Sequence, residues 1–466
     1  MPVQTPHADY AYRKPDWAKL RAFAEGARAV RASGDVYLPR LSGQTDAEFD
    51  AYKRRAEVYG AIDRTIDGLE GAIFLKAPNI EVPVGAEIEA MTKDVDLMGK
   101  NLVEWIRTQV REVLTTARGG ALVDFTPAEA KAARPYIVSY TAEQIINWEI
   151  ATIGGAQTLI LVVLEEITQL PSVDPFVKTP KRSFRVLRLI EGKYVVEMWQ
   201  AVSEKTEEFT KTSETIPLRR GQPLDRIPFI FFGATGQSIT PEKPPLTDVV
   251  ELCHQHYMAA ADYAHGLHWV GLPTPYVCGA REKDTLKIGP STAIILDDPT
   301  CKVGMLEFTG QGLSSLEKRL NDLERKMAVL GARILEEQKT AAEAADTVRL
   351  RQGGDISTLG AISDAVSRAC EAMVDLLLWW NGEEKPDSTV ELNMDFQLAK
   401  LPPAELTALL QAWQAGGISK ESFLFNLKRG QLLPEDRTVE DEMAKLETET
   451  LPGMSSAPDT VPGKKP

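Results

Sequence analysis

Residues 312–338 have the sequence GLSSLEKRLNDLERKMAVLGARILEEQ, and their pattern organises the rest of the chain. Apolar residues recur in this stretch at alternating spacings of three and four: Leu313, Leu316, Leu320, Leu323, Met327, Leu330 and Ile334. That spacing puts them on one side of an α-helix, as a single seam. Ser314, followed three residues later by Glu317, predicts a capping box at the start. We therefore predict a helix over 312–338.

The seam is followed by a different kind of sequence. Residues 339–363 are rich in small residues and contain Gly353-Gly354, which predicts a loop. An apolar helix is predicted next, over 361–380, and it ends in Leu376-Leu377-Leu378-Trp379-Trp380. The pattern is thus a helix, a polar insert and a second helix.

Composition limits the classes of function. The chain has 67 acidic and 53 basic residues, a formal net charge of -14. A protein that holds DNA by neutralising phosphates is usually basic, so tight DNA binding is not expected, although a surface that DNA slides past remains possible. The cysteines (Cys253, Cys278, Cys301 and Cys370) are scattered, which predicts reduced thiols in an intracellular protein and no zinc site. Apolar runs are short, and no signal sequence or membrane span is expected.

Periodicity divides the chain into regions. Residues 1–120 show helical spacing, whereas 119–235 alternate with period two and predict strands at 120–125, 135–140, 157–167, 183–190, 194–200 and 207–212. A helix with many small residues is predicted at 246–270, and short strands follow within 271–309. Helices are predicted again within 401–447, and the Pro-, Gly- and Ser-rich end, 448–466, predicts disorder. The fold class predicted is α+β, mainly helical.

Candidate chemistry is sparse. Asp262, His265 and His268 are spaced by three, so they share one helix face and could ligate a metal in a metal-dependent hydrolase. Partly exposed histidines at a subunit interface are the other interpretation. The chain lacks phosphate-binding loops and a GxSxG nucleophile motif. We therefore expect a structural or assembly protein that is not an enzyme and carries no metal or other cofactor.

Basic residues mark two predicted loops. Arg281, Glu282, Lys283 and Lys287 lie between the short strands of 271–309, and Lys339, Arg349 and Arg351 lie in the polar insert. Two solvated loops would explain them, and so would two loops that face DNA or a protein partner.

Several segments, in this order, resemble the portal proteins of tailed bacteriophages. The residues that carry the resemblance are Tyr37-Leu38-Pro39, YKRRAEVY at 52–59, TIDGLEGAIFLKAP at 65–78, PLTDVV at 245–250 and GGIS at 416–419. The resemblance extends to about residue 447. None of these segments is catalytic, and the resemblance depends on their occurring in this order.

The resemblance implies a portal fold with wing, stem, clip and crown regions. Residues 1–240 would form the wing, including the strand-rich part 119–235, while 246–270 and 312–338 would be the stem helices. The clip would be 271–309, and Arg281, Glu282, Lys283 and Lys287 would contact the adaptor. The remaining regions would be a channel loop (339–360), an inner wing helix (361–400), a crown (401–447) and a disordered tail (448–466). Lys339, Arg349 and Arg351 would then face DNA.

The same resemblance implies the assembly. The chain would form a homo-oligomeric ring, usually a dodecamer in that family, at the portal vertex of a virion made in the host cytoplasm. Its partners would be the major capsid protein, a terminase, a head–tail adaptor and double-stranded DNA, which passes without sequence specificity. The seam residues Leu313, Leu316, Leu320, Leu323, Met327 and Leu330 would pack the stem, between neighbouring subunits. A scaffold or adaptor protein without a channel remains an alternative.

Overall fold

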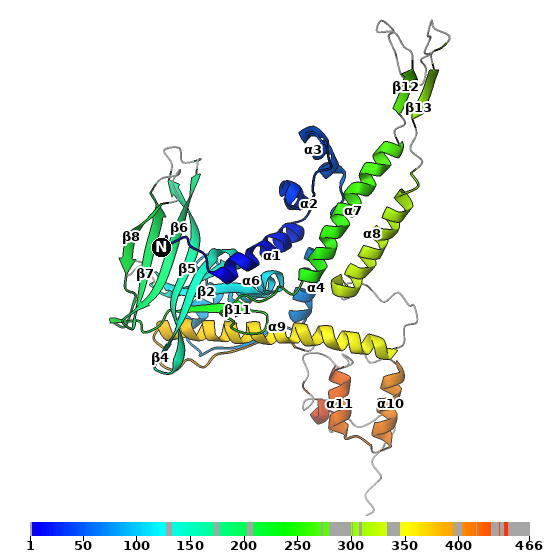
Figure 1. Ribbon diagram of the computed structural model, residues 1–466. Coiled ribbons are helices and arrows are strands. Elements are labelled where there is room, and N and C mark those ends of the chain that lie inside the picture. Colours follow the sequence, from blue (N-terminus) through cyan, green and yellow to red (C-terminus); the bar gives the residue numbers. More distant parts are fainter. Residues whose placement is uncertain are drawn as a thin grey trace, which may run out of the picture. The chain divides into compact units, whose positions relative to one another are not determined.

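The computed structural model describes residues 2–126, 133–171, 176, 178–202, 208–271, 274–278, 300, 302–306, 310–332, 345–394, 396, 403–415, 417–429, 438 and 442–445. The chain forms two compact units, Met1–Met394 and Asp395–Pro466. Helices and antiparallel sheets both occur, so the fold is α+β, as the sequence predicted (Figure 1). The predicted disordered tail, 448–466, lies outside the described residues.

The N-terminal part of the first unit is helical. Its helices are α1 (Ala8–Glu25), α2 (Ala27–Ala32), η1 (Gly34–Val36), α3 (Asp46–Arg55), α4 (Ala61–Ile73), α5 (Ala86–Lys93) and α6 (Leu102–Thr116). Gly26, with φ of 96°, separates α1 from α2, because few residues other than glycine adopt that conformation. Full capping boxes start α3, at Thr45 and Glu48, and α6, at Asn101 and Glu104.

Antiparallel strands form the middle of the unit. Their bounds are β2 (Arg118–Phe125), β3 (Pro135–Thr141), β4 (Ile145–Ile153), β5 (Ala156–Pro171), β6 (Lys178–Ile190), β7 (Lys193–Ala201), β8 (Phe209–Thr215), β9 (Leu218–Arg219), β10 (Gln222–Pro223) and β11 (Phe229–Gly233). One sheet has the order β11-β2-β3, another the order β4-β5-β6-β7-β8, and β9 pairs with β10. The six strands predicted within 119–235 correspond to β2, β3, β5, β6, β7 and β8. Strand β4, after the short helix η2 (Ala142–Gln144), was not predicted.

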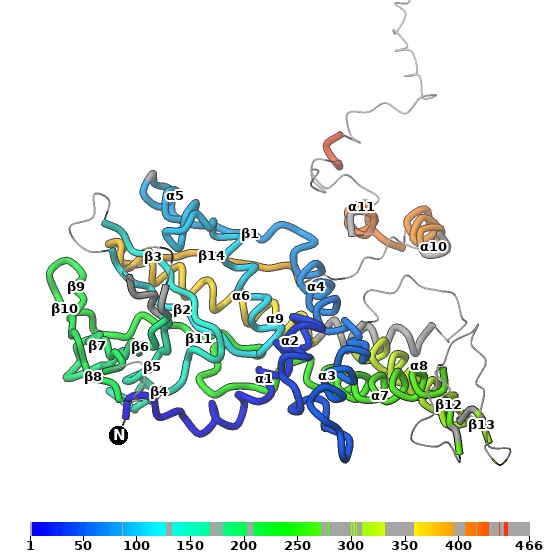
Figure 2. The backbone as a smooth tube through the Cα atoms, turned by 90° about the horizontal axis from the view of Figure 1, so that it is seen from above, coloured from blue at the N-terminus to red at the C-terminus, as the bar shows by residue number. Residues whose placement is uncertain are grey.

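The main core lies around the three-stranded sheet. Helices α6 and α9 (Ala345–Trp380) both contact this sheet and each other (Figures 1 and 2). Buried side chains from these elements fill the space between them: Trp105, Val110, Val113, Leu122, Phe232, Val366, Ala369, Cys370 and Met373. A Cβ atom at Gly120 would overlap the Phe229 ring, so the glycine lets β2 and β11 pack closely. The end of α9 is followed by β14 (Thr389–Glu391), which pairs with β1 (Asn79–Glu81).

The predicted loop at 339–360 is wrong over most of its length. The structure is helical from Ala345, and one continuous helix, α9, replaces the predicted start at 361. Gly353 and Gly354 lie inside this helix. Each costs only about 1 kcal/mol relative to alanine, and a helix already anchored by its buried second half extends readily through them.

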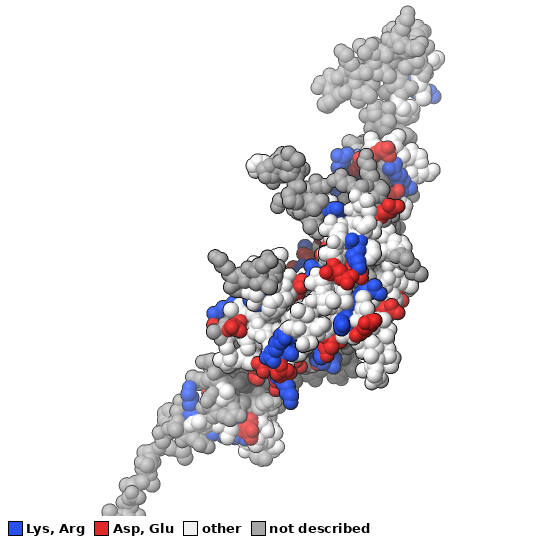
Figure 3. Space-filling model, turned by 90° about the vertical axis from the view of Figure 1, so that its left-hand side faces the viewer, with Lys and Arg blue, Asp and Glu red and all other residues white. Residues whose placement is uncertain are grey.

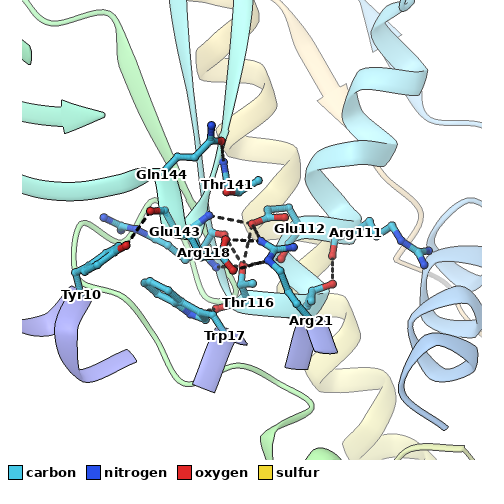
Figure 4. Close-up of polar contacts among 12 residues, drawn as sticks. Tyr10, Trp17, Arg21, Arg111, Glu112, Thr116, Arg118, Thr141, Glu143 and Gln144 are labelled. Atoms are coloured by element: carbon cyan, nitrogen blue, oxygen red, sulfur yellow. Dashed lines mark hydrogen bonds and ion pairs between the residues drawn. The ribbon is translucent and has the colours of Figure 1, made fainter. Parts of the chain in front are cut away.

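A charged network holds α1 on the rest of the unit. The Arg21 guanidinium donates to both carboxylate oxygens of Glu143 at 2.5 and 2.8 Å, and to Oε1 of Glu112 on α6 at 2.6 Å (Figure 4). Trp17 Nε1 donates to the Thr116 carbonyl at 3.0 Å, and Tyr10 Oη to the Glu143 carbonyl at 2.9 Å. Burial raises the pKa of Glu112, and the charge of Arg21 and its hydrogen bond act against that rise.

A buried arginine fixes the segment that leads from β11 to the next helix. The Arg118 guanidinium lies 4.6 Å from the centroid of the Trp148 ring and 4.2 Å from that of Phe231. It donates to the Ser238 carbonyl at 2.7 Å, and burial lowers its pKa to about 9. Glu242 accepts from the amides of Ala234 and Thr235, both at 3.0 Å, which orders the same segment.

The second unit contains α10 (Pro403–Gln414) and α11 (Lys420–Arg429). Helix α10 begins at the predicted proline, which suits the first turn because its missing N–H would be unpaired there. Trp413 and Phe423 stack with their centroids 4.9 Å apart and 11° between the ring planes, joining the two helices.

Candidate functional site

A helical hairpin with strands at its end is the candidate functional element. Helix α7 (Thr247–Gly271) and helix α8 (Leu313–Met327) pack against each other, and α8 continues as the π-helix η3 (Ala328–Ala332). Between the helices, β12 (Thr274–Cys278) pairs antiparallel with β13 (Lys302–Leu306). The strand pair follows the end of α7 and leads back to the start of α8 (Figure 1).

The apolar seam of α8 is unevenly buried. Leu323 and Met327 are 4% and 0% exposed, whereas Leu330 is 54% exposed. The other seam positions, Leu313, Leu316 and Leu320, are half-buried. The single chain already buries Leu323 and Met327, so these two side chains are covered within one subunit, and packing of the seam between neighbouring subunits stays a prediction. Exposed apolar surface remains at the end of the seam, where Val329 and Leu330 lie.

The predicted capping box of this helix is also wrong. Helix α8 begins at Leu313 with Gly312 as its N-cap, and no side chain caps it. Ser314 therefore lies inside the first turn, two residues after the N-cap position. The Leu313 amide instead donates to the Gly310 carbonyl at 2.9 Å, which starts the helix through a backbone turn. Residues 333–338 of the predicted helix lie outside the described residues.

Small residues allow the two helices to approach. A Cβ atom at Gly266 would lie 2.6 Å from Cδ2 of Leu313, so glycine is needed at that crossing. Nearer the other end of the hairpin, Cys253 Sγ lies 3.3 Å from Met327 Sδ. Burial raises the pKa of the Cys253 thiol to about 12, which leaves it protonated and unreactive. The hairpin is thus a closely packed pair within one chain.

The N-terminal helices contact the hairpin through a row of tyrosines and histidines. His254 Nε2 lies 2.9 Å from the carbonyl of Tyr37, and burial lowers the pKa of His254. The His256 ring lies 5.2 Å from the Tyr59 ring, and its Nε2 is 3.3 Å from Oε1 of Glu324 on α8. These contacts fix the hairpin against the segment between α2 and α4.

Helix α3 contacts the C-terminal half of α7, the half that leads to β12. Tyr52 Oη donates to Oδ1 of Asp262 at 2.5 Å, and the Tyr52 ring lies edge-on to His265 at 5.4 Å. Arg55 Nη2 lies 3.2 Å from His268 Nε2. Burial and the bond to Asp262 raise the pKa of Tyr52, so its hydroxyl stays protonated.

The spacing of Asp262, His265 and His268 does not produce a metal centre. Asp262 accepts from Tyr52, His265 from Trp269 Nε1 at 2.9 Å, and His268 faces Arg55. Among the residues that the structure describes, no group of three or more His, Cys, Asp or Glu side chains could hold a metal ion. We therefore do not carry the metal-dependent hydrolase forward.

Most of the predicted DNA- and adaptor-contacting residues fall where the structure gives no side-chain position. Arg281, Glu282, Lys283, Lys287 and Lys339 lie outside the described residues. For Arg349 and Arg351 only the backbone is described, and it belongs to α9. Figure 3 shows one face of the molecule, on which Lys and Arg side chains alternate with Asp and Glu instead of forming a patch of one sign.

Sequence reasoning missed two groups. Arg21, Glu112 and Glu143 carried no local signal, because they lie on three separate elements. Tyr52 and Asp262 are 210 residues apart, so no spacing rule could pair them.

In the part of the chain that is described, none of the helices combines the length and the hydropathy needed to cross a bilayer.

Comparison with known proteins leaves the family open. A family model described as "Domain of unknown function (DUF4055)" matches residues 245–381, which include the hairpin but less than half of the chain. No curated protein matches.

Solved structures similar to this chain include those of gene transfer agent particles. One, titled "Virion of native gene transfer agent (GTA) particle", is 12% identical, with a TM-score of 0.37 over 87% of this chain and 99% of that one. Another, titled "Neck of empty GTA particle computed with C6 symmetry", is 14% identical, with a TM-score of 0.36 over 86% and 97%. A third, "Neck of native GTA particle computed with C12 symmetry", is 11% identical, with a TM-score of 0.33 over 79% and 89%.

Proposed function

We propose that this chain is the subunit of a portal: a homo-oligomeric ring, a dodecamer by family resemblance, at one vertex of a phage-like capsid. The ring forms the channel through which double-stranded DNA is packaged and ejected. It also binds the terminase and later the head–tail adaptor, and it contacts the major capsid protein. The chain itself catalyses nothing in this proposal; ATP hydrolysis belongs to the terminase.

The hairpin carries the proposal. Helices α7 and α8 would be the stem, and the segment between them, with β12 and β13, would be the clip. The paired helices place β12 and β13 beyond the ends of α7 and α8, where a docking partner can reach them (Figure 1). The body with its sheets would be the wing, and α10 and α11 would belong to the crown.

Residues that carry the sequence resemblance lie against this hairpin. Tyr37, from the YLP segment, contacts His254 through its carbonyl. Tyr52 and Tyr59, at the two ends of the YKRRAEVY segment, contact Asp262 and His256. Two of the resembling segments thus help to hold the proposed stem.

Charge suits a channel for DNA. The net charge of -14 limits the number of phosphate contacts that a moving duplex would have to break. A channel that does not retain phosphates passes DNA of any sequence.

Native mass spectrometry and negative-stain imaging of the full chain test the ring. We expect a closed ring of identical subunits with a central opening, over a range of protein and salt concentrations. Monomers or open filaments at micromolar concentration would contradict the proposal and would favour a scaffold or adaptor without a channel.

A pair of variants sharpens this test. Leu330→Asp changes an exposed residue, so the subunit should stay folded while contacts between subunits weaken. Lys420→Asp, on α11, alters charge on the second unit and should leave the ring intact. Rings unaffected by Leu330→Asp would show that the exposed end of the seam does not join subunits.

High-resolution cryo-EM of the ring tests the proposed DNA-facing residues. We expect Lys339, Arg349 and Arg351 to point toward the ring axis. Side chains that point away from the axis would remove these three residues from the channel without affecting the ring itself.

A further inference from the structure

The turn that follows α8 departs from the pattern of its own sequence. The apolar seam continues with alternating spacings of three and four through Leu330, which predicts an unbroken α-helix with Leu330 on the same side as Leu323 and Met327. The structure has instead the π-helix η3, from Ala328 to Ala332. Leu330 is 54% exposed there, whereas Leu323 and Met327 are buried.

The geometry of a π turn accounts for this exposure. In an α-helix, Leu330 would follow Leu323 by seven residues, which is nearly two full turns, and would lie on the seam. A π turn closes its hydrogen bonds to the fifth residue instead of the fourth, so each residue advances less far around the helix axis. Leu330 is therefore turned away from the seam. Val329 lies off the seam in either geometry, and it is 44% exposed.

The backbone at the start of η3 is compatible with both geometries. The Ala328 N–H is shared between the carbonyls of Arg325 and Glu324, so the α-helical hydrogen bonding already loosens at the end of α8. Gly331 adds to this, because glycine favours an α-helix less than any residue except proline. A change from π to α would exchange hydrogen bonds within this turn only, since the buried Met327 anchors the end of α8.

The surroundings of η3 suit a buried Leu330. Helices α4 and α7 contact η3, and they lie beside the end of α8 (Figure 1). Met327 contacts Cys253 of α7, and α7 runs antiparallel to α8, so an α-helical Leu330 would face the part of α7 before Cys253. Val249 and Val250 in that part are buried. Apolar neighbours of this kind favour the α state.

We propose that residues 328–332 are a two-state segment, in which the π state exposes Leu330 and the α state packs it on the seam of its own chain. The equilibrium between the two states is a property of one chain and does not depend on the proposed function. Its use does rest on that function, because a contact between subunits is proposed at the exposed end of the seam. The π state would offer Leu330 to a second copy of the chain, and the α state would withhold it.

A metal clamp measures the α state. Histidines introduced by Ala328→His/Ala332→His are four residues apart, so in an α-helix they share one face and can bind one Ni²⁺ ion together, whereas the wider π turn separates them. The reference variant, Glu317→His/Asn321→His, places the same spacing at exposed positions of α8 itself. Isothermal titration of both full-length variants with Ni²⁺, with the wild type as the blank, gives the two affinities.

The ratio of these affinities reports the population of the α state, because binding to a minor state is weakened by its fraction. We expect the pair at 328 and 332 to bind Ni²⁺ about 10- to 1,000-fold more weakly than the reference pair, which corresponds to an α state populated at about 0.1–10%. Affinities within about tenfold of each other would mean that the segment is already α-helical, and a ratio above about 1,000 that the α state is inaccessible. Either result would overturn the proposal.

Thiol labelling tests whether Leu330 is the side chain that moves. Leu330→Cys and, as the matched control, Val329→Cys are each combined with the histidine pair at 328 and 332. Cys278→Ser and Cys301→Ser remove other thiols, since Cys278 is exposed. Saturation with Ni²⁺ should slow maleimide labelling at position 330 by about tenfold or more and leave position 329 unchanged.

Unchanged labelling at position 330, or equal slowing at both positions, would contradict the two-state segment. Both measurements need only the folded chain, so a failure to form rings would leave their outcome as it is. The proposed portal function and this inference can therefore fail separately.

Discussion

The N-terminal helices are held at two places by different kinds of contact. One place is the main body of the first unit, which contains α6 and the sheets, and the other is the hairpin of α7 and α8. On the body, Arg21 of α1 lies between the carboxylates of Glu112 and Glu143, a contact that requires charge. On the hairpin, α3 contacts α7 through the Tyr52 hydroxyl, which donates to Asp262, and through Arg55, which lies beside His268. Substitutions at the two contacts should therefore differ in the size of their effects.

The largest effect is expected inside the hairpin. Leu323→Asp places a carboxylate at a position that is 4% exposed, and should destabilise the packing of α7 on α8 by about 3 kcal/mol or more. Leu330→Asp, at the exposed end of the same seam, should change the stability by less than about 0.5 kcal/mol. Denaturant unfolding of both variants provides the measurement. Equal losses would mean that the seam is not buried within one chain.

The next largest effect concerns the body. Arg21→Ala leaves Glu112 and Glu143 without their cation, and should cost about 2–3 kcal/mol. Arg13→Ala, on the same helix, removes a surface pair with Asp16 and should cost about 1 kcal/mol or less. Hydrogen exchange of α1 compares the two variants. Similar losses would show that the Arg21 network is no stronger than a surface ion pair.

A smaller effect is expected at the α3 contact. Tyr52→Phe removes the donor to Asp262 but keeps the ring against His265, and should weaken the attachment of α3 by about 1–2 kcal/mol. Tyr12→Phe, where the side chain is 74% exposed, should have no measurable effect. Exchange rates of the α3 amides report the difference. Unchanged rates in Tyr52→Phe would assign the attachment to other contacts.

A pH effect from Glu112 should be the smallest. Burial raises the pKa of Glu112 against the charge of Arg21, so the folded chain binds a proton there more tightly than the unfolded chain does. The contribution of this carboxyl to stability should therefore decrease as the pH rises through its pKa. Denaturant unfolding between pH 5 and pH 8 should show that decrease in the wild type and a smaller one in Glu112→Gln. An equal pH dependence in both proteins would assign the effect to other groups.

The sequence predicted elements well where one periodicity dominates. Six strands within 119–235 and the start of α10 at Pro403 were found because alternation and proline are local signals. Strand β4 was missed, although it pairs with β5 along most of its length. The capping box at Ser314 and the loop at 339–360 were wrong, because a backbone turn at Gly310 and the packing of α9 overruled local preference.

The candidate site was only partly predictable. The sequence identified the two hairpin helices and singled out Asp262, His265 and His268 as a group on one face. It could not identify their partners, because Tyr52 and Arg55 lie on α3, more than 200 residues before α7 in the chain. A spacing compatible with metal ligands proved to be a set of hydrogen-bond acceptors for Tyr52, Arg55 and Trp269.

By itself, the sequence determined the α+β class, six of the strands within 119–235, and a seam on α8, because hydrophobic periodicity acts over a few residues. Only the tertiary structure decided what that seam packs against. Leu323 and Met327 are buried within the same chain, Met327 against Cys253 of α7, while Leu330 stays exposed. The physical reason is that a periodic apolar face must be buried, but its spacing does not say against which element. The choice of α7 depends on shape, because Gly266 of α7 leaves the space that Leu313 of α8 occupies.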